Sequence, residues 1–189
     1  MVTSVSVVNE ALELIAAQTT ITGLNDGSPA GNAAGVLYAP AVNLLLRQLD
    51  PAFARRTAAL APAVGGTIPP PWSAEYLYPA DCLRLRQVRP APANVVANDP
   101  QPVRAQVAFD AGLTAKVVVC NLTSAYAVYT SGMPGVGQEN LWDSAFIEAV
   151  ARRLANPLAM ALAGRPDFAK EILEESQAFA QLAELVDEI

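Results

Sequence analysis

The sequence has no histidine among its 189 residues and only two cysteines, Cys82 and Cys120. Without histidine, the chain lacks the commonest general base and the commonest metal ligand. Two cysteines cannot complete a structural zinc site, so buried, reduced thiols are the simpler interpretation. We therefore expect no metal, no cofactor and no catalytic centre of a common type.

Charge is also scarce, because 16% of the residues are charged and 52% are hydrophobic. Two explanations stay open: many small apolar residues, or apolar surface buried against partners. The net charge is −6, and residues 167–189 carry all of this excess. The remaining chain holds eleven acidic and eleven basic residues. This balance disfavours nucleic-acid binding through a basic patch.

Several motifs of catalysis and targeting are missing as well. The glycines at 132, 135 and 137 are not followed by the Lys-Ser/Thr of a phosphate loop, and there is no Gly-x-Ser-x-Gly elbow. Acidic pairs such as Glu174 and Glu175 leave a carboxylate-dependent hydrolase as an open, unfavoured alternative. With neither a basic leader nor a run of 18 apolar residues, we expect a chain that is not secreted by a signal peptide and not membrane-spanning.

Residues 1–61 are expected to be helical. Apolar residues recur at helical spacing over 5–17, with Ser4 or Ser6 as the cap. Ser28 followed by Pro29 predicts the start of a second helix. Pro40 predicts a kink there or two helices that meet. Pro51 is expected to open a further turn or helix up to Leu60.

Residues 62–137 are expected to form proline-rich loops and β-hairpins, because residues 62–102 hold nine of the fifteen prolines. Alternation over 83–86 predicts a strand with one wet face. Alternation over 103–109, a turn at 110–112 and the valines at 117–119 predict a hairpin, and 125–130 predict a third strand. Residues 131–137 are expected to form a flexible loop.

Residues 138–189 are expected to be helical, beginning with a helix capped by Asp143 and bent at Pro157. A final helix would carry an apolar seam with acidic residues around it. Two alternatives stay open: the seam packs against its own domain, or it contacts a partner. In the second case we expect a subunit or portal interface formed by Phe168, Ile172, Phe179, Leu182, Val186 and Ile189. The predicted fold is a single α+β domain, mainly α: a helical bundle with a small antiparallel β insertion and proline-rich loops.

Short motifs in a fixed order carry a family resemblance. Asn9-Glu-Ala-Leu12 is followed by Ile21-Thr-Gly-Leu-Asn-Asp-Gly-Ser28, and then by Tyr-x-Pro, Leu-Leu-Arg and Pro-x-Phe-Ala at 38–40, 45–47 and 51–54. Trp-x-x-x-Tyr-x-x-Pro-x-Asp-Cys-Leu-Arg spans 72–84, and Leu-Trp-Asp-Ser-Ala-Phe spans 141–146. In this order the motifs resemble phage head-to-tail adaptor (connector) proteins of the tail tubular protein A type. One departure is Ala52, where that family often has Trp.

The resemblance implies a non-enzymatic virion protein at the head–tail junction, assembled in the host cytoplasm. Such a protein binds the portal, forms a ring, expected to be a dodecamer, and receives a downstream tail or nozzle protein. DNA passes through the lumen during genome ejection without sequence-specific binding, and no membrane is involved. An alternative is an oligomeric scaffold or adhesive domain of a mobile element. Motif residues expected to fix the subunit's shape are Tyr38, Pro40, Pro51, Phe53, Trp72, Tyr76, Pro79, Asp81, Cys82 and Arg84.

Overall fold

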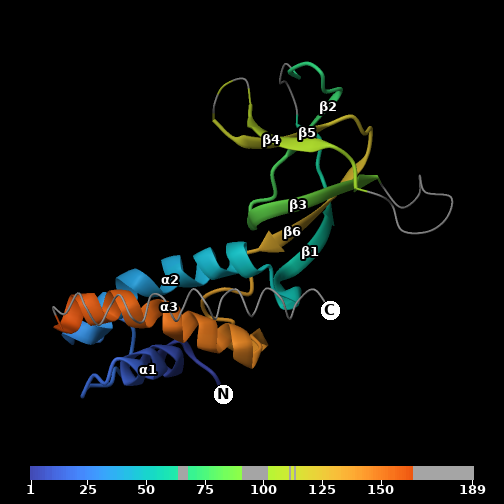
Figure 1. Cartoon of the computed structure of the whole chain (residues 1–189). Coiled ribbons are helices and arrows are strands. Elements are labelled where there is room, and N and C mark those ends of the chain that lie inside the picture. Colours follow the sequence, from blue (N-terminus) through green and yellow to red (C-terminus); the bar gives the residue numbers. More distant parts are fainter. Residues whose placement is uncertain (64–67, 91–101, 111, 113, 164–189) are drawn as a thin grey trace. The chain divides into compact units, whose positions relative to one another are not determined.

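The computed structural model describes residues 1–63, 68–90, 102–110, 112 and 114–163. The chain divides into two compact units, one formed by residues 55–131 and the other by the segments on either side of it. We call them the β unit and the helical unit (Figure 1). Among the described residues, no helix is both long and apolar enough to cross a membrane.

The described part of the helical unit contains three α-helices. These are α1 (Ser4–Leu14), α2 (Pro29–Leu49) and α3 (Ser144–Ala163), with short 3-10 turns η1 (Ala52–Ala54) and η3 (Glu139–Leu141). Helix α3 packs against both α1 and α2 (Figure 1). Its buried residues recur at helical spacing, with Val150, Leu154 and Leu158 fully inaccessible to solvent.

Local signals account for most helix boundaries. Ser28 caps α2 and Pro29 occupies its first turn, as predicted. Asp143 accepts a hydrogen bond from the backbone N–H of Phe146 at 2.7 Å, which confirms it as the cap of α3. The predicted cap of α1 is wrong: Thr3 is the cap, and Ser6 returns its hydrogen bond from the third helical position.

Pro40 and Pro157 both lie inside continuous helices. Each proline removes the N–H that the carbonyl four residues earlier would receive. For Pro40 that carbonyl belongs to Val36, which is 71% exposed, so water can replace the missing donor. Helix α2 is therefore one helix and not the two that Pro40 allowed.

The β unit contains six antiparallel strands in two sheets of three. The first sheet has the order β1 (Arg55–Ala59), β6 (Ala125–Ser131), β3 (Cys82–Pro90). The second has the order β2 (Ala74–Leu77), β5 (Lys116–Cys120), β4 (Ala105–Phe109). The predicted strand at 83–86 and the predicted hairpin of β4 and β5 are confirmed. The third predicted strand, β6, pairs instead with β1 and β3.

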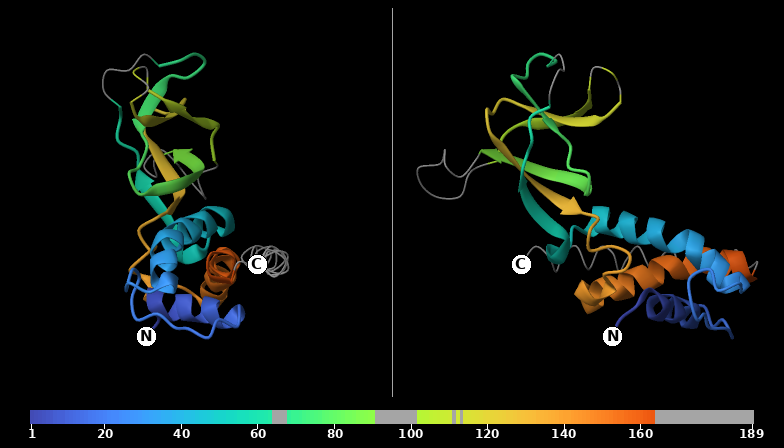
Figure 2. Two further views of the ribbon diagram at one scale, coloured as in Figure 1. Left: turned by 90° about the vertical axis from the view of Figure 1, so that its left-hand side faces the viewer. Right: turned by 180° about the vertical axis from the view of Figure 1, so that it is seen from behind.

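The two sheets join at both edges. Pro62 forms a bridge to Tyr76, which carries the chain after β1 alongside β2, and Val88 on β3 forms a bridge to Val103 just before β4. These bridges link the two sheets around one core, and we call this six-stranded arrangement a small barrel (Figure 2). Its interior holds Leu60, Tyr76, Val88, Val118, Cys120, Ala125, Ala127 and Tyr129.

The predicted helical bundle with a small β insertion is wrong. The described residues form three α-helices and six strands. The helices belong to the helical unit, and the strands form a separate unit with its own hydrophobic core. Residues 55–59, expected to be helical, form β1 because they pair with β6, about seventy positions later in the chain. The segment Arg-Arg-Thr-Ala-Ala has no strong local strand pattern, so this distant pairing decides its structure.

Candidate functional site

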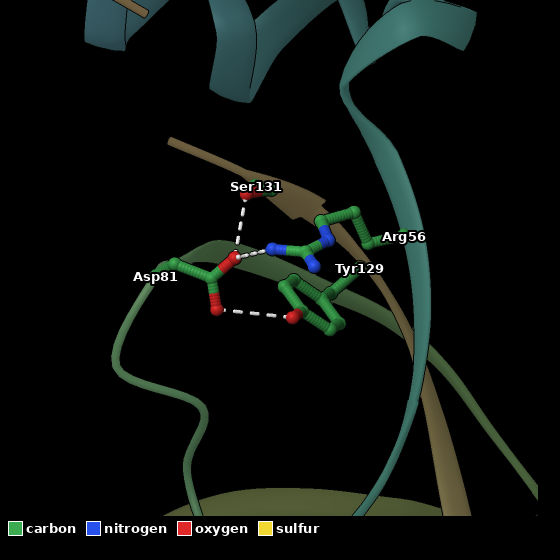
Figure 3. A network of polar contacts seen from close by, with 4 residues as sticks. All are labelled: Arg56, Asp81, Tyr129 and Ser131. Carbon is green, nitrogen blue, oxygen red and sulfur yellow. Dashed lines mark hydrogen bonds and ion pairs between the residues drawn. The ribbon is translucent and has the colours of Figure 1, made fainter. Parts of the chain in front are cut away.

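In the β unit, the motif residue Asp81 lies at the centre of a network of polar side-chain contacts (Figure 3). The backbone N–H of Cys82 donates to the carbonyl of Pro79 at 3.0 Å, which closes a tight turn. This turn precedes β3 and presents the Asp81 carboxylate to side chains from two other strands. The Pro-x-Asp-Cys pattern of the sequence is therefore a turn that places a carboxylate.

Three side chains donate hydrogen bonds to Asp81. Tyr129 on β6 donates from its hydroxyl to Oδ1 at 3.0 Å, and Ser131 on β6 donates to Oδ2 at 2.7 Å. Arg56 on β1 donates from Nη1 to Oδ2 at 2.9 Å (Figure 3). We call these four residues the Asp81 cluster. It fastens the turn before β3 to the other two strands of the first sheet, β6 and β1.

The electrostatics of the Asp81 cluster favour a holding role over proton transfer. Partial burial raises the pKa of Asp81, but the hydrogen bonds from Ser131, Tyr129 and Arg56 outweigh it, so the pKa is lowered. Burial, together with the hydrogen bond and charge of Asp81, raises the pKa of Tyr129. Near neutral pH the carboxylate is ionised and engaged as an acceptor, while the phenol keeps its proton. Neither group is prepared to act as a base or nucleophile.

The other motif residues of the β unit hold its loops and core. Tyr76 is buried and donates from its hydroxyl to the carbonyl of Leu122 at 2.7 Å. The guanidinium of Arg104 lies 5.6 Å from the centre of the Trp72 ring. Cys82 packs against the barrel core, and burial raises its pKa, so the thiol is an inert packing group. Arg84 is exposed on β3.

In the helical unit, Tyr38 is 1% exposed and donates from its hydroxyl to Glu139 Oε1 at 3.1 Å. Glu139 also accepts from the backbone N–H of Gly137 at 3.0 Å. Burial, followed by the charge of Glu139, raises the pKa of Tyr38. This pair ties α2 to the segment after β6. The sequence analysis predicted a flexible loop over 131–137, but Ser131 belongs to β6, and Pro134 and Gly135 are buried.

The remaining motif residues build joints of the helical unit. Pro51 is buried after the end of α2, and the Phe53 ring meets Phe146 edge-on at 5.2 Å. The indole N–H of Trp142 donates to the carbonyl of Pro134 at 2.6 Å. Pro40 is the exception, since it lies on the exposed side of α2.

The two earliest motifs meet in space. Asn9 on α1 pairs with the backbone of Ile21 through two hydrogen bonds, accepting at 2.8 Å and donating at 3.2 Å. Asp26 accepts from the backbone N–H groups of Thr22 and Ser28 at 2.9 and 3.0 Å. These contacts fix the connection between α1 and α2. The Asn-x-Ala-Leu and Ile-x-x-Leu-x-Asp-x-Ser motifs therefore act as one structural unit.

A hollow of about 330 Å³ opens between α2 and α3. It is lined by Leu37, Pro40, Ala41, Leu44, Arg153, Asn156 and Pro157. Both helix-internal prolines, Pro40 and Pro157, are among these residues. The hollow therefore offers a partner a largely apolar wall. Val36 and Met160, at 71% and 58% exposure, extend the apolar surface along the same two helices.

Sequence reasoning did not select Arg56, Tyr129, Ser131 or Glu139. Their signal lies in pairings between distant strands and segments, which the order of residues does not display. The six residues of the predicted partner-facing seam, 168–189, lie outside the described residues. Within the described part, no three metal-binding side chains of the His, Cys, Asp or Glu type gather at one place.

No protein-family model and no curated protein matches this chain.

Proposed function

We propose that this chain is a phage head-to-tail adaptor: a non-enzymatic subunit that binds the portal, forms a ring around the exiting DNA and receives a tail component. The observation that carries the proposal is the order of short motifs from Asn9 to Phe146, which resembles that of adaptor proteins. Most of these motif residues serve as structural joints. Their polar groups form hydrogen bonds within the chain, which agrees with a structural subunit.

The hollow between α2 and α3 supports the binding part of the proposal. A ring subunit needs complementary surfaces for its two neighbours, because contacts within a ring are heterologous. The hollow and the exposed side chains of Val36 and Met160 provide apolar surface of the kind that interfaces bury. Under the proposal, this surface contacts a neighbouring subunit when the portal assembles the ring.

Native mass spectrometry of the chain mixed with its cognate portal tests the proposal. The expected spectrum contains the portal ring with many copies of the chain bound. The variant Val36→Glu should lose this complex while keeping the melting temperature, because Val36 is 71% exposed. Val107→Glu, at a 42% exposed position of β4, is the matched control and should still assemble. A chain that stays monomeric beside intact portal would overturn the proposal.

A further inference from the structure

Strand β4 is an edge strand, and the outer side of its backbone has no partner over residues 105–109. The second sheet has the order β2, β5, β4, so β4 pairs along its length with β5 alone (Figure 1). After β4, the N–H of Asp110 donates to the carbonyl of Ala115 on the β5 side. Because backbone groups alternate between the two sides of a strand, those of Ala105, Val107 and Phe109 point to the outer side. Within the described part of the chain, no backbone hydrogen bond occupies them.

The outer edge of β4 also lacks the features that protect the other edges of the two sheets. The N–H of Ala63 donates to the carbonyl of Glu75, and that of Leu77 to the carbonyl of Ala61, so residues 61–63 run beside β2. Strand β3 has two register shifts and three arginines, and β1 begins with two arginines. Charged side chains and bulges hinder pairing at sheet edges. Strand β4, with the sequence Ala-Gln-Val-Ala-Phe, has no charge, no proline and no register shift.

Two large apolar side chains of β4 are exposed as well. Val107 lies opposite the core residue Val118 and is nevertheless 42% exposed. Phe109, two positions further along the same side of the sheet, is 58% exposed. An edge strand that presents unpaired backbone groups beside apolar side chains is a template for adding another strand.

A second copy of β4 fits this edge in one antiparallel register. Pairing centred on Val107 places Val107 opposite its own copy and Ala105 opposite Phe109 of the second copy. Each of the three resulting pairs exchanges two backbone hydrogen bonds, so every outward-pointing group of both strands is used. A register shifted in either direction would use fewer of them. The reason is that Val103 already donates to the carbonyl of Val88, and that the chain turns back toward β5 after β4.

The side chains are complementary in the same register. Phe109 of each copy lies opposite the small Ala105 of the other, and the two Val107 side chains meet at the centre, so the exposed apolar groups are covered. One position beyond the strand at each end, Arg104 lies opposite Asp110 of the second copy. Arg104 is exposed and stacks on an aromatic ring of its own chain, and Asp110 accepts hydrogen bonds within its own turn. Exposed charge pairs of this kind add little affinity but favour this register over others.

We propose that two copies of this chain associate through β4, which joins their second sheets into one continuous sheet. The contact is two-fold symmetric and closes on itself, so it yields a dimer. It therefore differs from the head-to-tail contacts of a ring, and the inference does not rest on the adaptor function. Each copy contributes a strand of only five residues, so we expect a weak dimer that depends on concentration.

Sedimentation velocity of the full chain over a wide range of concentration tests the association. The parent chain should shift from monomer to dimer as its concentration rises. Val107→Glu should raise the dissociation constant at least about tenfold, because two carboxylates would then lie directly opposite each other. Val36→Glu, at a 71% exposed position of α2, is the matched control and should dimerise as the parent chain does. The two variants have opposite expectations in the portal experiment, so failure of one proposal is distinguishable from failure of the other.

Cysteine crosslinking under mild oxidation tests the register. Directly paired residues have Cα atoms about 5.5 Å apart, which a disulfide can span, so Val107→Cys should form a crosslinked dimer by itself. Ala105→Cys and Phe109→Cys should each fail to crosslink alone, because their like positions are about 14 Å apart. A mixture of these two variants should crosslink. The parent chain, with its free Cys82 and Cys120, gives the background.

Three results would overturn the proposal. The first is a parent chain that stays monomeric at every concentration. The second is equal dimerisation of the parent chain and Val107→Glu, with melting temperatures showing that both are folded. The third is Val107→Cys that crosslinks no more than the parent chain, or Phe109→Cys that crosslinks with itself.

Discussion

Replacing Asp81 by alanine should destabilise the β unit substantially, because two of its hydrogen-bond donors, Tyr129 and Ser131, are buried. The change leaves the hydroxyls of Tyr129 and Ser131 without their acceptor, and these residues are 2% and 0% exposed. An unsatisfied buried donor costs about 1–3 kcal/mol, so the expected loss is about 2–4 kcal/mol. Removing Arg56 instead should cost at most about 1 kcal/mol, because its side chain is 52% exposed.

Lowering the pH should remove part of the stability that Asp81 contributes to the β unit. The pKa of Asp81 is lower in the folded chain than in the unfolded chain, so at pH values between the two the unfolded state binds more protons. The stabilisation is complete above the unfolded pKa, about 3.9, and is lost as the pH falls through the folded value. Asp81→Asn cannot titrate, so the stability difference between it and the parent chain should shrink below about pH 4.

The two tryptophans make the assay specific to one unit, because Trp72 lies in the β unit and Trp142 in the helical unit. In a Trp142→Phe background, fluorescence during thermal unfolding reports on the barrel. A loss of 2 kcal/mol should lower its Tm by at least about 8 °C. Equal losses for Arg56→Ala and Asp81→Ala, or a difference between Asp81→Asn and the parent chain that acid leaves unchanged, would refute the reasoning.

Two further predictions concern the helical unit. A Cβ at position 35 would overlap the Asn25 side chain, so Gly35→Ala should cost about 1–3 kcal/mol in thermal unfolding although alanine favours helix. The control Ala39→Gly lies on the exposed side of the same helix and should cost only about 1 kcal/mol. If Gly35→Ala raised the free energy of unfolding, the described overlap with Asn25 would be wrong. Asn9→Ala removes two hydrogen bonds to the backbone of Ile21 and should lower the free energy of unfolding by about 1–3 kcal/mol. The control Asn32→Ala, at an exposed position, should be close to neutral. Equal effects of the two variants would contradict the role given to the Asn9–Ile21 contact.

Elements set by nearby residues could be predicted from the sequence. Ser28 with Pro29, Asp143 as a cap, and the hairpin of β4 and β5 depend on a few adjacent positions. The division into two units could not be predicted, because β1 becomes a strand only by pairing with β6. Barrel closure likewise depends on bridges between strands that are separate in sequence.

The candidate site shows the same limit. Asp81 and Pro79 stand out as a motif, but the partners on β1 and β6 are known only once the first sheet is formed.

The most direct test of the central claim is the mass of the assembly that the chain forms with its cognate portal. If the chain is a head-to-tail adaptor, native mass spectrometry should detect the portal ring carrying about one copy of the chain for each portal subunit. The bound copies should disappear with Val36→Glu. A spectrum containing only free chain and bare portal, at concentrations where both are folded, would contradict the claim.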